Sequence, residues 1–109
     1  SMAFVDVTIL IDVIGEIIAF NGVSPNNDGF NDHFQIQNIQ FLEPNNTVII
    51  YNRWGDKVFE MNNYNPDQSE SRFEGRQNSG KELPSGVYFY KVEFSTGRPG
   101  LNGYLTLKR

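Results

Sequence analysis

Apolar and polar residues alternate along several short stretches of this chain, and that two-residue period is typical of half-buried β-strands. In residues 5–13, Val or Ile occupies every second position, with Asp6, Thr8 and Asp12 between them, and Gly15 ends the pattern. We predict a strand there, which is either the first strand of the domain or the tail of a preceding repeat.

Further strands are predicted where β-branched and aromatic residues gather between turn signals. They cover residues 17–20, 34–36 with an extension towards 41, 47–53, 57–61, 87–95 and 101–108, with a short one at 72–74. No stretch has a convincing helical period. About seven short strands predict an all-β fold, and the architecture that suits them best is an immunoglobulin-like antiparallel β-sandwich.

Turn signals separate these strands. Pro25 and Gly29 interrupt the polar residues 21–33, and Trp54-Gly55-Asp56 predicts a tight hairpin. Residues 62–82 are expected to be mostly loop. The Leu-Pro-Ser-Gly sequence at 83–86 suits a tight turn, because Pro fixes φ and Gly accepts positive φ.

Composition limits the class of protein. The 109 residues suit one domain, and 13 Asn and 10 Gly fit a fold rich in turns. The chain has no Cys, which excludes disulfides and thiolate zinc sites, and no apolar run long enough to span a membrane. We interpret Ser1-Met2 as an expression scar and divide the chain into residues 1–15 and a domain at 16–109, which we expect to be monomeric.

Charge is unevenly distributed along the chain. The net charge is −4, residues 1–52 hold six acids and no Lys or Arg, and all nine basic residues lie from Arg53 onward. An acidic chain without a basic run argues against nucleic acid as a partner. The asymmetry is either an accident of solvated faces or a basic surface that meets an acidic partner.

The sequence offers little for catalysis. His33 is the only His, so a catalytic triad or a zinc site built on imidazole lacks its other members. We expect His33 to be a surface residue at the entry of a strand. The carboxylates are scattered through loops, and we predict that the protein is not an enzyme.

One loop has the composition of a calcium site. Asn26, Asp28, Asn31 and Asp32 surround Gly29, and calcium takes oxygen ligands from flexible loops with a Gly at the sharp turn. The match to an EF-hand loop is weak, because Gln35 stands where the bidentate Glu belongs. The structural alternative is that these side chains cap the backbone N–H groups of the loop itself.

The segment Arg53-Trp54-Gly55 has two interpretations. A Trp ring most often packs on the core, and Arg53 can stack on an aromatic ring, so we favour a packing role. The alternative is a recognition hot spot beside the hairpin.

The final strand is another candidate surface. If it lies at a sheet edge, it can bind a partner by strand addition, and the candidate residues are Tyr104, Leu105, Leu107, Lys108 and Arg109. The alternative is that Lys108 and Arg109 only keep that edge soluble.

Four segments together resemble a known family. They are Val-Ser-Pro-Asn-Asn-Asp-Gly-Phe-Asn-Asp at 23–32, Val-Ile-Ile-Tyr-Asn-Arg-Trp-Gly at 48–55, Leu-Pro-Ser-Gly-Val-Tyr-Phe-Tyr at 83–90 and Gly-Tyr-Leu-Thr-Leu-Lys-Arg at 103–109. In this order and spacing they resemble the gliding-motility-associated C-terminal domain, the type B sorting domain of the bacterial type IX secretion system. Asn27 departs from the Gly often found there, and Arg72-Phe73-Glu74-Gly75 stands in for a common Trp-Asp-Gly.

The resemblance implies a folded export and anchoring signal without catalysis of its own. Its cargo would be a large, adhesin-like cell-surface protein that passes through the periplasm to the cell surface or the medium. Its partners would be the outer-membrane type IX translocon and a dedicated outer-membrane partner protein. The competing class is an adhesive or spacer module that binds carbohydrate or protein, with Tyr64, Trp54 and Tyr104 as a sugar-stacking platform.

Overall fold

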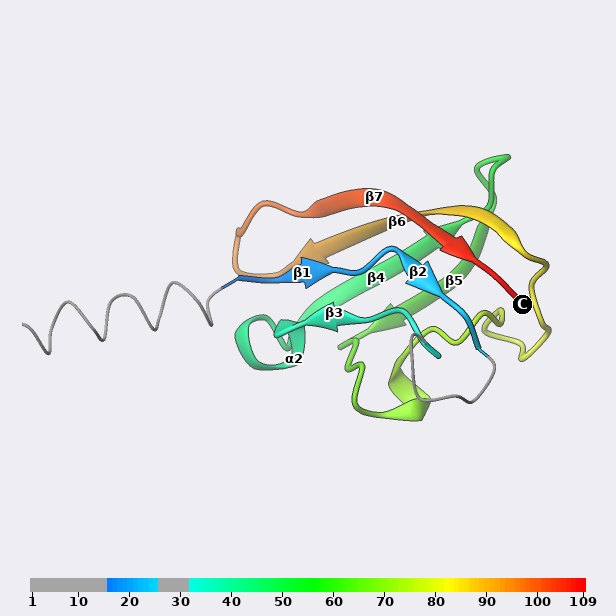
Figure 1. Cartoon of the computed structure of the whole chain (residues 1–109). Coiled ribbons are helices and arrows are strands. Elements are labelled where there is room, and N and C mark those ends of the chain that lie inside the picture. Colours follow the sequence, from blue (N-terminus) through cyan, green and yellow to red (C-terminus); the bar gives the residue numbers. More distant parts are fainter. Residues whose placement is uncertain (1–15, 26–31) are drawn as a thin grey trace, which may run out of the picture.

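Two β-sheets form the fold in a computed structural model that describes residues 16–25 and 32–109 (Figure 1). The strands are β1 (Ile18–Ala19), β2 (Gly22–Val23), β3 (Ile36–Gln37), β4 (Asn46–Tyr51), β5 (Lys57–Asn62), β6 (Gly86–Phe94) and β7 (Leu101–Leu107). The all-β sandwich of about seven strands that the sequence predicts is confirmed. The strand predicted at residues 5–13 lies outside the described residues.

The larger sheet has the order β2-β7-β6-β4-β5, and β1 and β3 form the smaller, antiparallel sheet. Residues 18–23 pass from the smaller sheet to the larger one, where β2 pairs with the end of β7. This pair is parallel, whereas the other strand pairs are antiparallel. The final strand therefore lies between β2 and β6 at its C-terminal end rather than at a free edge.

Two predicted strand segments have another conformation. The extension towards residue 41 is a short helix, α2 (Ile39–Leu42), because Asn38 takes a left-handed conformation with φ of 70° and its carbonyl accepts the N–H of Leu42. Residues 72–74 are not a strand, and the chain before them forms a turn of 3-10 helix, η1 (Ser69–Ser71).

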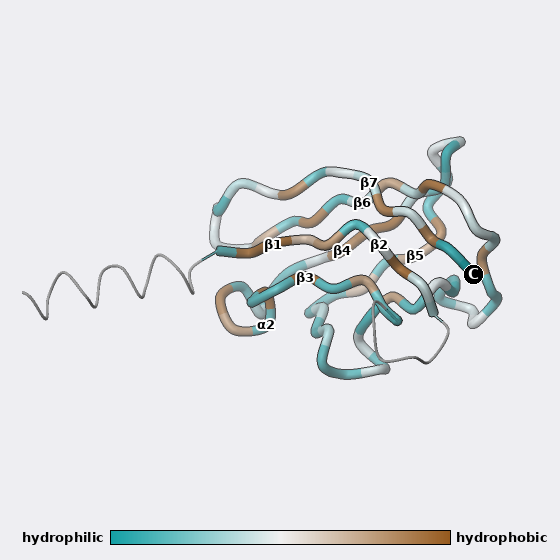
Figure 2. The backbone as a smooth tube through the Cα atoms, in the orientation of Figure 1, coloured by the Kyte–Doolittle hydropathy of each residue, from teal (hydrophilic) through white to brown (hydrophobic). Residues whose placement is uncertain are grey.

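Alternation along the strands sets the core, and Figure 2 shows hydrophobic positions interrupted by hydrophilic ones along the larger sheet. In β4, Val48 and Ile50 are buried, and in β6 Tyr88 and Val92 are buried, as their spacing predicts. The buried hydrophobic residues are Val23, Phe34, Ile36, Ile39, Val48, Ile50, Phe59, Tyr64, Phe73, Leu83, Tyr88, Val92, Leu105 and Leu107.

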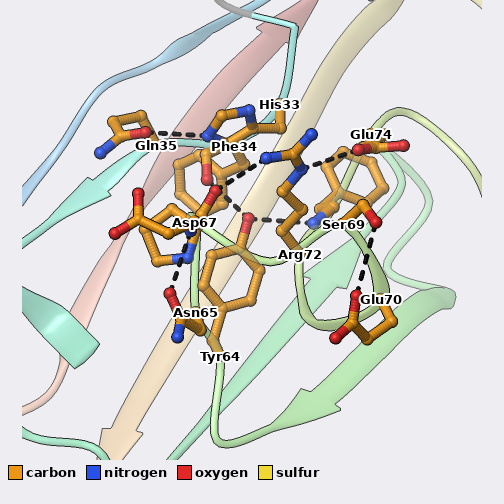
Figure 3. A network of polar contacts seen from close by, with 12 residues as sticks. His33, Phe34, Gln35, Tyr64, Asn65, Asp67, Ser69, Glu70, Arg72 and Glu74 are labelled. Atoms are coloured by element: carbon orange, nitrogen blue, oxygen red, sulfur yellow. Dashed lines mark hydrogen bonds and ion pairs between the residues drawn. The ribbon is translucent and has the colours of Figure 1, made fainter.

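The long segment 63–85 supplies much of the second layer, because the smaller sheet has only two strands. Tyr64 is fully buried, and its hydroxyl donates to the Phe34 carbonyl at 2.5 Å and accepts the Phe73 N–H at 2.9 Å (Figure 3). Burial raises the pKa of Tyr64. The Tyr64 hydroxyl thus links the residues just before β3 to segment 63–85, and it provides a hydrogen-bond partner for two buried backbone groups.

The side chains of Glu43 and Asn78 each make two hydrogen bonds, near one end of the larger sheet and at its outer edge. Glu43 is buried, and its carboxylate accepts hydrogen bonds from Arg98 at 2.9 Å and from Thr96 at 2.8 Å. At the outer edge of β5, the Asn78 amide accepts the Glu60 N–H at 2.8 Å and donates to the Glu60 carbonyl at 2.9 Å. The Asn78 side chain therefore occupies part of an edge that another strand could otherwise extend.

Candidate partner-binding surface

The tip of the β4–β5 hairpin presents Arg53 and Trp54 to solvent. The Asn52 side-chain oxygen accepts the N–H groups of Trp54 at 3.0 Å and Asp56 at 2.9 Å, and Gly55 has φ of 87°. This Asx-type turn fixes the backbone of the tip. The predicted hairpin is confirmed.

The preferred packing role of Trp54 is wrong, because its ring is 73% exposed. Arg53 stacks on it, with the guanidinium carbon 4.4 Å from the ring centroid. The tip lies beyond the end of the sheet, where no core exists for the indole to join. The ring and the guanidinium therefore form a planar, exposed pair of the kind enriched at protein interfaces.

A groove of about 240 Å³ separates this tip from the start of β6. We call it the hairpin groove, and it is lined by Asn52, Arg53, Trp54, Pro84, Ser85, Gly86, Val87 and Tyr88. Figure 1 places the hairpin, the start of β6 and the end of β7 at the same end of the larger sheet. Sequence reasoning singled out the hairpin but missed its partner segment; the Leu-Pro-Ser-Gly turn was the available signal.

Arg109 supports the far wall of this groove. Its guanidinium donates to the carbonyls of Leu83, at 2.6 Å, and Gly75, and its backbone N–H donates to the Ser85 hydroxyl at 2.9 Å. Its side chain is 26% exposed and lies 3.6 Å from Glu82. The residue that sequence reasoning placed in a partner contact is thus held against the loop at 75–85.

The other candidates on β7 divide between core and surface. Leu105 and Leu107 are buried, with exposures of 0% and 1%, so their side chains belong to the core. Tyr104 is 53% exposed, and Lys108 is exposed. Of these candidates, the side chains open to a partner are therefore those of Tyr104 and Lys108.

Most of the basic residues are neutralised within the fold. Six of the nine pair with acids: Lys57, Arg72, Arg76, Lys91, Arg98 and Arg109. Among residues 16–25 and 32–109, the other three, Arg53, Lys81 and Lys108, form no ion pair, and of these Arg53 lines the hairpin groove and Lys108 precedes Arg109. The charge available to an acidic partner near the hairpin groove therefore comes mainly from Arg53 and Lys108.

The predicted calcium ligands Asn26, Asp28 and Asn31 lie outside the described residues, and Asp32 lies just inside them. Within the described part of the chain, no group of three or more His, Cys, Asp or Glu side chains could hold a metal ion. The calcium site stays a prediction.

His33 is half-buried, and its Nε2 lies 2.8 Å from the Gln35 side-chain oxygen (Figure 3).

The sugar-stacking platform cannot form as predicted, because Tyr64 is in the core. Among the described residues, no helix is long and apolar enough to cross a membrane.

Most of the chain matches the model of a known family. The family model of the CHU_C Type IX secretion signal domain matches residues 17–107. The chain belongs to this family. The resemblance proposed from the sequence is thereby confirmed, and the CHU_C domain spans both sheets described above.

A solved structure has the same fold as this CHU_C domain. It is that of PorZ, described as an essential bacterial surface component of the type-IX secretion system of human oral-microbiomic Porphyromonas gingivalis. The TM-score is 0.58 at 16% sequence identity, and the match covers 88% of this chain but only 12% of PorZ. No curated protein matches the chain.

Proposed function

We propose that this CHU_C domain is a non-catalytic secretion signal that directs a large, adhesin-like protein through the outer membrane by the type IX system. The cargo would cross the periplasm and finish on the cell surface or in the medium. The observation that carries the proposal is the match of the secretion signal family over residues 17–107.

The geometry of the hairpin groove supports its recognition by a protein partner. Its two walls, residues 52–54 and 84–88, fall within two of the four segments on which the family resemblance rests. Backbone hydrogen bonds of the hairpin turn hold the first wall, the pairing of β6 with β7 holds the second, and Arg109 braces the second. A preformed surface loses little conformational entropy on binding, which favours recognition of one shared shape on many cargoes.

The partners would be the outer-membrane translocon and a dedicated outer-membrane partner protein. Arg53 and Lys108 would meet acidic groups on that partner, and Trp54 would supply the apolar contact. Side chains of this kind dominate binding energy when they become fully desolvated at the centre of an interface.

The test is a fusion of residues 16–109 to a fluorescent protein that carries a periplasmic export signal, expressed in a bacterium with a type IX system. We expect fluorescence on the surface or in the medium, and its loss when the translocon is disabled. Periplasmic retention with the translocon and the partner protein both present would contradict the proposal and favour an adhesive or spacer module.

A further inference from the structure

A row of aromatic residues crosses three adjacent strands on the outer face of the larger sheet. Tyr51 of β4 pairs with Phe89 of β6, and Phe89 pairs with Tyr104 of β7. Their neighbours Ile50, Tyr88 and Leu105 are buried, so the alternation of the strands turns these three side chains away from the core. We call Tyr51, Phe89 and Tyr104 the outer aromatic row.

The outer aromatic row continues into the hairpin groove. Val87 lines the groove and lies on the same face of β6 as Phe89. Four of the seven exposed large hydrophobic side chains of the described residues belong to this surface: Trp54, Val87, Phe89 and Tyr104. Contiguous exposed apolar surface on a small domain marks an interaction site more often than scattered single residues do.

We propose that the hairpin groove and the outer aromatic row are one docking face for a folded protein of the secretion machinery. The partner surface would have an apolar centre that covers Phe89 and Tyr104, with carboxylates that face Arg53 and Lys108. The inference rests on the proposed function and extends it from the groove to the face of the sheet.

Charge and composition select a protein with acidic groups as the occupant. Trp, Tyr, Phe and Arg are the residue types enriched at the centres of protein interfaces, and all four are present on this surface. Lys108 follows Tyr104 and Thr106 in the outward alternation of the chain, so it borders the same face as the aromatic row. Arg53 and Lys108, two of the three cations without an ion pair among the described residues, thus flank one apolar surface, and an acidic rim on the partner would complement them.

The test uses the same fluorescent fusion with Phe89→Thr and Tyr104→Thr together. Thr keeps a high strand propensity, and both side chains are about half exposed, so the melting temperature should change little. We expect secretion to fall about tenfold or more, as the loss of a binding hot spot implies. The matched control is Phe41→Thr, which removes a 74% exposed residue on α2, at the opposite end of the larger sheet from the hairpin (Figure 1), and should secrete normally.

A second variant tests the face without altering strand packing. Arg53→Glu with Lys108→Glu reverses the two cations, which make no ion pair within the described residues, and should also lower secretion about tenfold with an unchanged melt. Should both variants secrete like the wild type, while wild-type secretion still depends on the translocon, the docking face is refuted and the proposed function stands.

Two further outcomes would also overturn the inference. Failure of the wild-type fusion itself would remove the proposed function and the docking face together. A concentration-dependent dimer in sedimentation, abolished by the Thr pair while secretion persists, would assign the face to a second copy of this chain.

Discussion

Replacement of Arg109 by Ala should destabilise the whole domain, although this residue is the last of the sequence. The side chain donates to the carbonyls of Leu83 and Gly75, and an ion contact with Glu82 adds to these bonds. A hydrogen bond from a charged donor contributes about 1.5–3 kcal/mol. The Gly75 carbonyl keeps its bond from the Leu83 N–H in the variant, whereas the Leu83 carbonyl loses the Arg109 bond.

These terms give a loss of about 2 kcal/mol in the free energy of unfolding, because the two bonds share one partly exposed side chain and do not add fully. For a domain of this size, that loss lowers the melting temperature by about 8 to 16 °C. Arg109→Lys should fall between the wild type and Arg109→Ala, since an ammonium group retains the charge but cannot reach both carbonyls in the same plane.

The assay is thermal and urea unfolding followed by circular dichroism. Fluorescence is a poor probe here, because the single Trp is already 73% exposed in the folded state. The matched control is Lys108→Ala, an exposed neighbour that should change stability by less than about 0.5 kcal/mol. Equal stability of Arg109→Ala and Lys108→Ala would refute the bracing role of Arg109.

Three further predictions concern the core, the sheet edge and the loop. Tyr64→Phe leaves the Phe73 N–H and the Phe34 carbonyl in the core without their hydrogen-bond partner. The variant should lose about 2–4 kcal/mol of unfolding free energy, as measured by urea unfolding. Burial raises the pKa of Tyr64, so the folded state favours the neutral phenol. This contribution to the unfolding free energy should be fully present below the unfolded pKa of about 10 and should decrease as pH rises further. An equally steep decrease in Tyr64→Phe would contradict this. Asn78→Ala should cost about 1 kcal/mol and increase self-association in sedimentation, because it uncovers the main chain of Glu60; a monomer as stable as the wild type would argue against it. Calcium should raise the melting temperature if Asn26, Asp28, Asn31 and Asp32 bind it, and an unchanged melt in excess calcium would remove that site.

Period-two patterns predicted the parts of the fold that are sheet. Val48 and Ile50 in β4, and Tyr88 and Val92 in β6, are buried where alternation places them. The pattern depends only on the geometry of a strand with one face on the core, so it is visible in the sequence alone. The same signal could not show that β2 pairs in parallel with β7, since pairing depends on tertiary arrangement.

Two aromatic residues show where sequence reasoning failed. Trp54 was expected to pack on the core and is exposed, whereas Tyr64, which only the competing adhesive module placed in a sugar-stacking platform, is buried. Asn63 takes φ of 59°, and the Asn46 side chain accepts the Tyr64 N–H, so the chain turns inward directly after β5. Neither effect has a periodic signature, because the first is the conformation of a single residue and the second is a contact between positions 18 residues apart.

The candidate surface could be predicted only where it depends on local sequence. The hairpin tip has a local sequence signal, and Arg53 and Trp54 lie there as a stacked pair. The contact of Arg109 with Gly75 has none, because it joins positions 34 residues apart. A side chain at the end of a strand gives no indication, in sequence, of the loop that it will meet.

The most direct measurement compares secretion of the fluorescent fusion carrying Trp54→Ala with that carrying Phe41→Ala. The two rings are 73% and 74% exposed, so both variants remove a similar apolar surface from opposite parts of the domain. If the secretion machinery reads the hairpin groove, Trp54→Ala lowers translocon-dependent secretion about tenfold or more, and Phe41→Ala leaves it at the wild-type level. Equal secretion of the two variants would contradict the claim that this surface is the signal.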